Sequence, residues 1–446
     1  GVIRMSSNVK SPAGNAISEY LVHGAKLSRR RFLGGAGALV TSVVVNPKFA
    51  AAQTTAPSTS LDASKPNSWI EIHADNTALI RTGKCDFGQS SIFTAYRQIV
   101  AEELSIPVEN ITTVIWGDTD VTPDGGGTFG LLRGNVQNLR KAAAYTREAI
   151  KVIAAEQLNV SVIAIKIDKG QLSAGGKALS YGEIVANNVL SLEIPVSGEL
   201  TSFRGVVVTG EPPFKPKSEY STIGQPLVNP ITPPKVRGDN IWVGDVKLPG
   251  MVHARVIHPA TLGSTLIKPG TLDNTKFPNS KLVTINNLLA VVSDNEWEAV
   301  KAAMAVAPAT QWSDWQGIPT TSDELEQYLR GKKDSGEVAE ITSSASKGDV
   351  NIKSAKTLTA NYFVPYHKHA PIGPMVSVAE VKNGNVVIHT HSQNPQFLRM
   401  AIAKMLKEDE ANVIIKTYVG PGHFGRSNGG NAGSEDEAAL LSVKLG

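Results

Sequence analysis

The sequence predicts an α+β fold with mixed sheets, in which one structural unit occurs twice. Short runs of alternating apolar residues indicate strands, and runs with apolar residues three or four positions apart indicate helices between them. The order strand, strand, glutamine-bearing loop, helix and strand begins near residue 69 and again near residue 376. The chain of 446 residues contains 40 glycines and 25 prolines, which favours turns over a helical bundle, and it is long enough for about two or three packed domains.

Residues 1–52 carry the basic charge of the chain. They hold seven of the 44 Lys and Arg residues and one of the 40 acidic residues. The segment Ser28–Leu33 (SRRRFL) precedes an apolar run over Gly34–Val45, and Ala50–Ala52 follows as a cleavage site. This order predicts a twin-arginine export signal, and therefore a periplasmic location or the outer face of the inner membrane. Because a membrane span needs about 20 apolar residues, we expect membrane association only through partners or an uncleaved signal.

The remainder of the chain has a net charge of −2, which gives no electrostatic footprint for nucleic acid. Cys85 is the one cysteine. A single cysteine cannot form an internal disulfide, and an iron–sulfur cluster needs about four thiolates. Any such cluster must therefore lie on another chain, and we interpret Cys85 as a small buried residue.

The first unit follows a polar linker over residues 53–66. Its predicted elements are strands over Trp69–His73 and Ala78–Thr82, a loop ending in Gly88-Gln89-Ser90, a helix over Ile92–Leu104 and a strand over Ile111–Trp116. The second unit repeats this order with strands over Val376–Val381 and Val386–Thr390, a loop with Gln393, a helix over Phe397–Leu406 and a strand over Val413–Val419. From glutamine to last strand the spacing is 22 residues in the first unit and 20 in the second, which indicates a duplicated cofactor domain.

A proline-rich spacer over residues 211–235 separates the first unit from a segment over residues 236–312. In that segment we expect strands over Ile241–Val246 and Met251–Val256, one or two strands over Lys281–Val292, and a helix over Glu296–Val306. Residues 330–348 are polar and are expected to form an exposed loop.

Four loops of the two units could carry chemistry. A glutamine amide at a helix start offers donors beside backbone N–H groups and a positive dipole end, which suits a phosphate or a metal-bound oxo group. Glycine-rich loops follow the last strand of each unit, at Asp124–Gly130 (DGGGTFG) and Gly420–Arg426 (GPGHFGR). Glycines let the backbone approach a bulky ligand closely, so the four loops together predict a site for an anionic cofactor.

These motifs resemble the xanthine oxidase family of molybdenum hydroxylases, in its isoquinoline 1-oxidoreductase-like and aldehyde dehydrogenase-like branch. The segment TGKCDFGQSS with WGDTDVTPDGGGTFG is similar to a first cofactor segment of that branch. The stretch GDNIWVGDVKLPGMVHARVIHP resembles its α/β hammerhead domain, and HSQNPQFLRMAIAKML with VGPGHFGRSNGG resembles its next cofactor segment. The resemblance extends over nearly all of residues 66–446 and places four motifs in the family's order.

The resemblance implies a first molybdopterin-binding segment over 67–210, a hammerhead domain over 236–312 and an incomplete second segment over 313–446. It implies a molybdopterin with molybdenum, in the cytosine dinucleotide form, and no metal ligand from the protein. The implied reaction is oxidation of an aldehyde or hydroxylation of an N-heteroaromatic compound, with oxygen from water. The implied partners are a small 2Fe-2S subunit that carries the iron–sulfur clusters, a cytochrome c subunit and a second chain that completes the large subunit.

The resemblance also assigns cofactor contacts. Gln393 matches the glutamine that the family sets against an oxo ligand of molybdenum, and Gly88 and Gln89 match the Gly-Gln that holds the pterin. Phe424 and Gly425 match the Phe-Gly whose backbone lines the metal site. The further contacts that it implies are Ser90, Gly127, Thr128, Phe129, Gly130, Gly422, His423 and Arg426.

The sequence departs from the family's pattern at three points. Ser90 stands where glycine is common, and Asn428 stands where some members have an acid, which leaves substrate orientation of the xanthine type in doubt. The glutamate that acts as general base in the family lies near the end of a longer chain and is expected to come from elsewhere.

Three other functions are compatible with parts of the sequence. His367 and His369, and likewise His389 and His391, are pairs that could each grip zinc or copper from one strand face, as in a periplasmic metal-binding protein. The segment Gly425–Gly429 fits the G-x-S-x-G pattern of serine hydrolases, which needs a sharp turn from strand to helix. The third alternative function is that of a non-catalytic partner subunit, which would be related to the hydroxylases but would hold no cofactor.

Overall fold

The computed structural model describes residues 61–446 except for short stretches. The stretches left out are 130–133, 135, 188–191, 262, 315–316, 318, 320, 333–355, 357, 366, 421–422, 424 and 428. The predicted export signal, the linker up to residue 60 and most of the predicted loop over 330–348 lie outside the described residues. The chain divides into two compact units, of which the first combines residues up to Leu248 with His369–Gly446, and the second is Pro249–Lys368.

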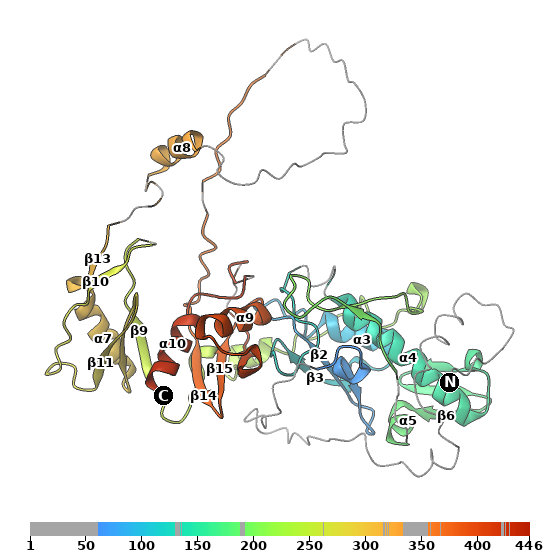
Figure 1. Cartoon of the computed structure of the whole chain (residues 1–446). Helices are drawn as coiled ribbons and strands as arrows, with labels where there is room; N and C mark the ends of the chain where they lie inside the picture. Colours follow the sequence, from blue (N-terminus) through green and yellow to red (C-terminus); the bar gives the residue numbers. More distant parts are fainter. Residues whose placement is uncertain are drawn as a thin grey trace. The chain divides into compact units, whose positions relative to one another are not determined.

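The first unit contains two three-stranded sheets of the same topology (Figure 1). The first sheet and its helix consist of β1 (Ile70–Ile72), β2 (Ala78–Thr82), α3 (Ala95–Leu104) and β3 (Ile111–Trp116). The second consists of β14 (Val378–Lys382), β15 (Asn385–Thr390), α9 (Pro395–Leu406) and β16 (Val413–Thr417). In each sheet the middle strand pairs antiparallel with the first and parallel with the last. The predicted duplication is therefore confirmed, with strand bounds within two residues of those expected.

The two glutamines are not equivalent in this duplication. Gln393 immediately precedes Asn394, which caps α9 by accepting a hydrogen bond from Phe397 N, and Pro395 opens the helix. In the first sheet α3 begins at Ala95 without a side-chain cap, so the predicted start at Ile92 is wrong. Gln89 therefore lies six residues before its helix, because an uncapped turn stands between the loop and α3.

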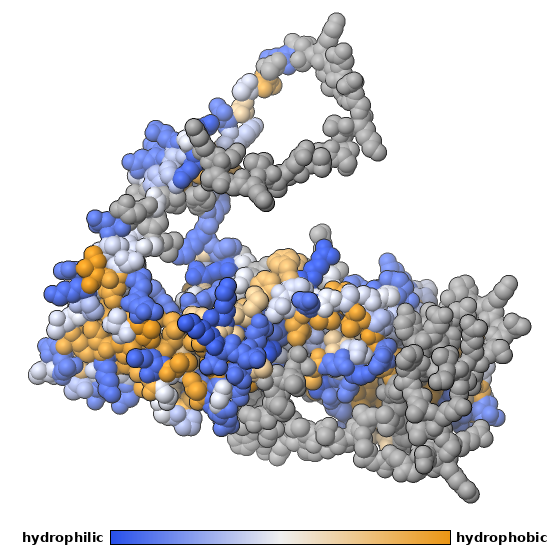
Figure 2. Space-filling model, viewed as in Figure 1, coloured by the Kyte–Doolittle hydropathy of each residue, from blue (hydrophilic) through white to orange (hydrophobic). Residues whose placement is uncertain are grey.

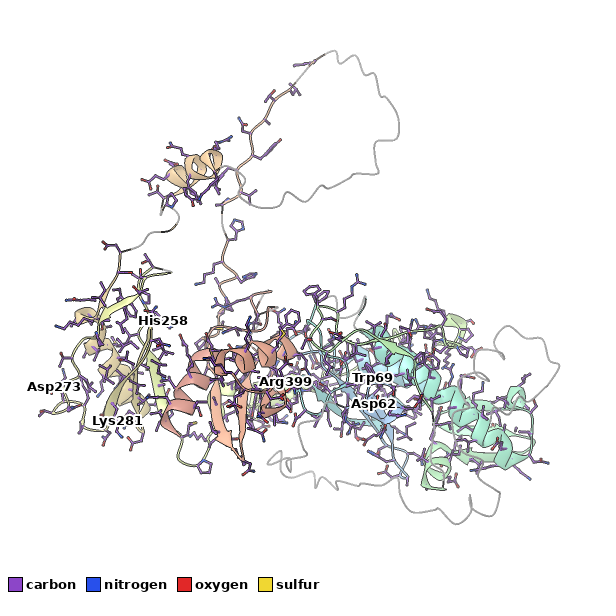
Figure 3. All side chains as sticks on the ribbon, in the orientation of Figure 1. Asp62, Trp69, His258, Asp273, Lys281 and Arg399 are labelled. Carbon is purple, nitrogen blue, oxygen red and sulfur yellow. The ribbon has the colours of Figure 1, made fainter. Side chains whose placement is uncertain are left out.

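Several elements of the first unit were not predicted. The largest is α4 (Val136–Leu158), an alanine-rich helix of 23 residues that packs against α3 and forms much of the core. The other elements of this unit are β4 (Lys166–Asp168), β5 (Gln171–Ala174), β6 (Lys177–Ser180), α5 (Tyr181–Asn187), β7 (Val196–Ser197), β8 (Val207–Val208), α6 (Thr232–Arg237) and α10 (Glu435–Leu445). Trp69 and Arg399 are labelled in Figure 3. Trp69 Nε1 donates to Ala63 O at 2.8 Å, and Arg399 Nε, in α9, donates to Glu410 O at 2.7 Å.

The two sheets are joined by the loop over residues 117–120, which follows β3 and runs beside β16. Thr119 N donates to Ile415 O at 3.1 Å, and Ile415 N donates to Thr119 Oγ1 at 3.0 Å. Thr417 N donates to the Asp118 carboxylate at 2.7 Å. We call this contact the interlock, because it ties the end of the first sheet to the last strand of the second.

The second unit has a three-stranded antiparallel sheet covered by one helix. The sheet has the order β11 (Ser280–Ile285), β12 (Leu288–Ser293), β9 (His253–Val256), and α7 (Glu296–Val306) packs on it. The remaining elements are β10 (Leu266–Lys268), β13 (Gln311–Trp312) and α8 (Ser322–Gly331). Figure 2 shows apolar residues on the visible surface of this unit. Ile267, Trp297 and Met304 are among the exposed apolar residues of the unit.

The predicted strand over Ile241–Val246 is wrong. Those residues form a short 3-10 helix, Val243–Asp245, because the Asp245 carboxylate accepts a hydrogen bond from Trp242 N and closes a turn. The predicted strands over 251–256 and 281–292 and the helix over 296–306 are confirmed. The domain boundaries at 236 and 312 stay predictions. Within the described residues, no helix combines the length and apolarity that crossing a membrane requires.

Two glycines provide a matched test of the interlock. Gly117 and Gly175 both adopt a left-handed φ, +69° and +57°. A Cβ at Gly117 would enter the Thr417 side chain, whereas one at Gly175 would meet nothing within 4 Å. We expect Gly175→Ala to lower the free energy of unfolding by about 1 kcal/mol, from the φ alone. Gly117→Ala should lose about 2 kcal/mol more, because the interlock must shift. Urea unfolding measures both, and equal losses would contradict the role given to the interlock.

Candidate functional site

Gln393 holds three loops together. Its side chain is 8% exposed. The amide Nε2 donates to Thr128 O at 3.3 Å, and Oε1 accepts from Ser427 N at 3.3 Å and from Ser427 Oγ at 3.4 Å. Its backbone takes part as well, since Gln393 N donates to Ser427 Oγ at 3.1 Å and Thr128 N donates to Gln393 O at 2.9 Å. The structure thus brings Gln393 and Thr128, two of the predicted site residues, into direct contact.

The first glycine-rich loop is anchored by a buried ion pair. Lys84 Nζ lies 3.5 Å from the Asp124 carboxylate, and both side chains are almost fully buried. Gly127 N donates to Phe203 O at 3.2 Å, and the Phe129 ring stacks on Phe203 with 4.7 Å between centroids. The backbone N–H groups of Gly127 and Thr128 therefore bond within the protein, while their role as cofactor contacts stays a prediction.

Cys85 supports this loop through its backbone. Its N–H donates to Thr128 Oγ1 at 2.9 Å. The side chain is 1% exposed, and burial raises the pKa of the thiol far above its ordinary value. The interpretation of Cys85 as a small buried residue is confirmed.

The loop with Gln89 is open to solvent at its tip. Gln89 is exposed, and its Oε1 accepts from Phe87 N at 2.8 Å. Gly88 has a φ of +103°, and the adjacent Ser90 has a φ of +62°. That left-handed backbone explains why glycine suits the position of Ser90, whose hydroxyl is fixed here to Asn229 at 2.7 Å.

The second glycine-rich loop meets the Gln89 loop. Gly420 N donates to Asp86 O at 3.2 Å. Arg426 N donates to His423 O at 3.0 Å, and its Nε donates to Ala432 O at 2.9 Å. Gly425 has a φ of +99°. Among the predicted contacts, Gly130, Gly422 and Phe424 lie outside the described residues, as does Asn428.

Two buried histidines of these loops, His391 and His423, have ring nitrogens without a hydrogen-bond partner among the described residues. The rings of His391 and His423 are 4.5 Å apart, and His423 lies 5.0 Å from the Phe87 ring. Within the described part of the chain, His391 Nε2 and both ring nitrogens of His423 are buried without a partner. Sequence reasoning placed His391 in a possible metal pair with His389 and missed its pairing with His423, 32 residues further along the chain.

Two regions of the chain, which contain the two duplicated sheets, are similar to known proteins. Two family models described as molybdopterin cofactor-binding domain match residues 30–224 and residues 332–446. One subunit of the nicotinate dehydrogenase of Pseudomonas putida is 28% identical over 80% of this chain and 30% of its own length. The beta subunit of isoquinoline 1-oxidoreductase from Brevundimonas diminuta is 30% identical over 52% of this chain and 33% of its own length.

The chain belongs to the xanthine oxidase family of molybdenum hydroxylases. A further relative is a membrane-bound aldehyde dehydrogenase of Gluconacetobacter polyoxogenes, described as pyrroloquinoline-quinone-dependent, which is 25% identical over 95% of this chain and 55% of its own length. The chain spans between 30% and 55% of the length of these three relatives. The resemblance to this family and the mixed α and β fold are both confirmed.

Three features of these loops fit the pterin cofactor of the xanthine oxidase family. The Gln393 amide has two N–H donors, and Thr128 O takes one of them. Gly88 leaves room for close approach, since the nearest atom to an added Cβ would be Gly420 O at 3.9 Å. Three nitrogens of His391 and His423 have no partner among the described residues, and each would cost about 1–3 kcal/mol of folding free energy unless a ligand bonds it. Gly88, His391, Gln393 and His423 are therefore the residues that these observations would place against the cofactor.

The metal-binding alternative gains no support from the described residues of this family member. No group of three His, Cys, Asp or Glu side chains in the described ranges could hold a metal ion. His367 and His369 are exposed. His389 has a partner of its own, since its Nδ1 lies 2.8 Å from the Tyr418 hydroxyl.

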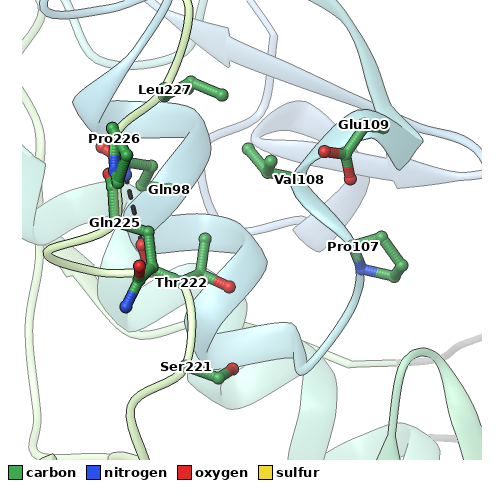
Figure 4. Close-up of a pocket in the computed structure, with 9 residues that line it drawn as sticks. All are labelled: Gln98, Pro107, Val108, Glu109, Ser221, Thr222, Gln225, Pro226 and Leu227. Carbon is green, nitrogen blue, oxygen red and sulfur yellow. Dashed lines mark hydrogen bonds between the residues drawn. The ribbon is translucent and has the colours of Figure 1, made fainter.

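A separate pocket of about 240 Å³ lies between α3 and the proline-rich spacer (Figure 4). Gln98 lines it and donates to Gln225 O at 2.8 Å, while Thr222 and Leu227 line its spacer side. Its lining shares no residue with the loops described above. The spacer beside it is held by the buried Glu102 carboxylate, which accepts from Thr222 N at 2.7 Å.

Ser427 tests the hydrolase alternative. Its side chain is fully buried and bonds Gln393 on both sides. We expect Ser427→Ala to lower the free energy of unfolding by about 1–2 kcal/mol, because Gln393 N loses its acceptor. The control Ser161→Ala, at an exposed cap without a side-chain hydrogen bond, should change it by less than about 0.5 kcal/mol. Chemical unfolding measures both, and labelling of Ser427 by a fluorophosphonate would contradict this structural role.

Proposed function

We propose that this chain is the cofactor-binding part of a molybdenum hydroxylase that oxidises an aldehyde or hydroxylates an N-heteroaromatic compound, with oxygen from water. The observation that carries the proposal is the junction at Gln393, where loops from both duplicated halves meet beside two buried histidines with unpaired nitrogens. The named activities of the relatives, on nicotinate, isoquinoline and aldehydes, support the substrate classes.

The bound cofactor, proposed in its cytosine dinucleotide form, would supply the two-electron oxidation and the transferred oxygen. The residues of this chain would bind and orient it. Gln393 would direct its remaining N–H toward the metal end, because its carbonyl side is fixed by Ser427. Gln89, exposed at the tip of its loop, would hold the pterin. The general base, a glutamate in the resemblance, would come from a longer chain or from a second polypeptide.

Electrons must leave through partner subunits under this proposal. Cys85 is buried and structural, so it cannot contribute to a cluster. We therefore propose a small 2Fe-2S subunit, and a cytochrome c subunit as the acceptor beyond it. The export signal over residues 1–52 supports a periplasmic enzyme, associated with the inner membrane through those partners or an uncleaved signal.

The metal and pterin content of the complex tests the central part of the proposal. The complex purified from cells that express the full gene should contain about one molybdenum and one pterin per copy of this chain, measured by mass spectrometry of metals and by pterin fluorescence. It should also reduce a dye with nicotinate, isoquinoline or an aldehyde as donor. A complex without molybdenum and pterin would contradict the proposal and favour a non-catalytic partner subunit. Zinc or copper in their place would favour the histidine-pair metal site.

Export is tested separately. A reporter that folds in the cytoplasm and is fused behind residues 1–52 should appear in the periplasm. Replacing Arg29, Arg30 and Arg31 by lysine should abolish that transfer, because the pathway recognises the arginine pair. A reporter that stays in the cytoplasm behind the intact leader would contradict the periplasmic location.

A further inference from the structure

The His391 and His423 rings form a buried polar pair that makes few hydrogen bonds to the described residues of the protein. His391 is 3% exposed and His423 is 1% exposed. Their rings meet edge to face at 4.5 Å, and three of their four ring nitrogens have no partner within the described residues. Buried polar groups in folded proteins are nearly always paired, so a pair that serves only packing would be replaced by apolar rings at no loss.

Burial also fixes what kind of group the pair can recognise. Burial lowers the pKa of His391 to about 4. Burial, with a smaller contribution from His391 and Arg426, lowers the pKa of His423 to about 3. Both rings are therefore neutral near pH 7, and each neutral imidazole carries one donor and one acceptor. Such a pair matches an uncharged heterocycle that also carries donors and acceptors, whereas a phosphate would favour cationic partners.

The pair lies where the two cofactor loops converge. His391 precedes Gln393 by two residues and directly follows β15. The ring of His423 lies against Phe87, which precedes Gly88 and Gln89. Gly420 separates the two sides: a Cβ there would come within 2.9 Å of the Phe87 ring and 3.2 Å of His391. The two imidazole rings therefore lie beside both the Gln89 loop and the Gln393 loop.

We propose that the imidazoles of His391 and His423 hydrogen-bond the pterin ring of the cofactor and position it between the two loops. This inference rests on the proposed function, because it assumes that the pterin binds at the junction of the duplicated halves. The family resemblance already implies a contact from His423 and none from His391. The inference assigns the His423 contact to its imidazole and adds the imidazole of His391.

The test uses His391→Phe and His423→Phe, which keep a planar ring and remove the polar atoms. The control is His389→Phe, two residues before His391 and within β15. The His389 Nδ1 is bonded to Tyr418, whereas its Nε2, 3.8 Å from Glu380, has no hydrogen-bond partner among the described residues. Pterin retention by the purified complex after dialysis should fall about tenfold in each of the first two variants, for the loss of one or two hydrogen bonds, and stay unchanged in the control.

Thermal unfolding of the cofactor-free protein, produced in a host that cannot make the pterin, provides the second measurement. Because they remove unpaired buried atoms, His391→Phe and His423→Phe should leave the midpoint unchanged or raise it. His389→Phe should lower it. If a phenylalanine variant does not fold, His423→Gln, which keeps a donor and an acceptor, should fold and retain more pterin than His423→Ala.

Four results would overturn the inference. A wild-type complex that contains pterin, together with variants that retain it fully, would exclude the two rings from the site while leaving the proposed function intact. Cofactor-free variants that lose stability as His389→Phe does would show that the rings are ordinary core residues. A wild-type complex without pterin would overturn both the inference and the proposed function, and zinc or copper lost on substitution of His391 or His423 would assign the pair to a metal.

Discussion

Hydrogen bonding between residues 117–120 and β16 is the constraint on which the site depends. The loop after β3 would otherwise be free to leave the second sheet, because the two sheets share no continuous strand. The interlock fixes it through Thr119 and Ile415, and Lys416 adds a bond of 2.8 Å to the Asp120 carboxylate. Gln396 Nε2 also reaches Thr119 O, so the first turn of α9 is tied to the same loop. The chain after residue 120 then places Thr128 against Gln393. The candidate site therefore combines residues that are 265 positions apart in the sequence.

Many buried polar groups around that junction are bonded. Among the described residues, Asp86 Oδ2, Asp124 Oδ2 and His389 Nε2 lack a hydrogen-bond partner, as do His391 Nε2 and both ring nitrogens of His423. The Glu435 carboxylate is buried and accepts from Thr390 Oγ1 at 2.6 Å and from Ala432 N at 2.9 Å. Ser392 Oγ accepts from Asn394 N at 3.1 Å and donates to Gly430 O. Such bonds hold the loops rigid before any ligand arrives, as a binding site on a preorganised framework requires. The nitrogens of His391 and His423, two rings in contact that have no partner among the described residues, therefore call for a bonding partner.

Local patterns in the sequence predicted the strands of the two duplicated sheets, because alternation and turn residues are properties of adjacent positions. Other features were beyond such patterns. Helix α4 is amphipathic through alanine, whose weak hydropathy conceals its buried face. The two glutamines seemed equivalent because each precedes a helix, yet only the second adjoins a capped start. Ser427 fitted a nucleophile pattern, and its true partner, Gln393, is 34 residues away in sequence. Contacts of that kind are set by packing, which a one-dimensional pattern does not contain.

The central claim is that one cofactor site forms where the duplicated halves meet. Hydrogen–deuterium exchange of the complex, compared with and without bound pterin, tests it most directly. The account predicts slower exchange on binding at residues 86–89, 126–129, 391–394 and 423–427 together, because the ligand would contact all four loops at once. Protection confined to one half, or found instead at the spacer pocket over residues 221–227, would contradict it.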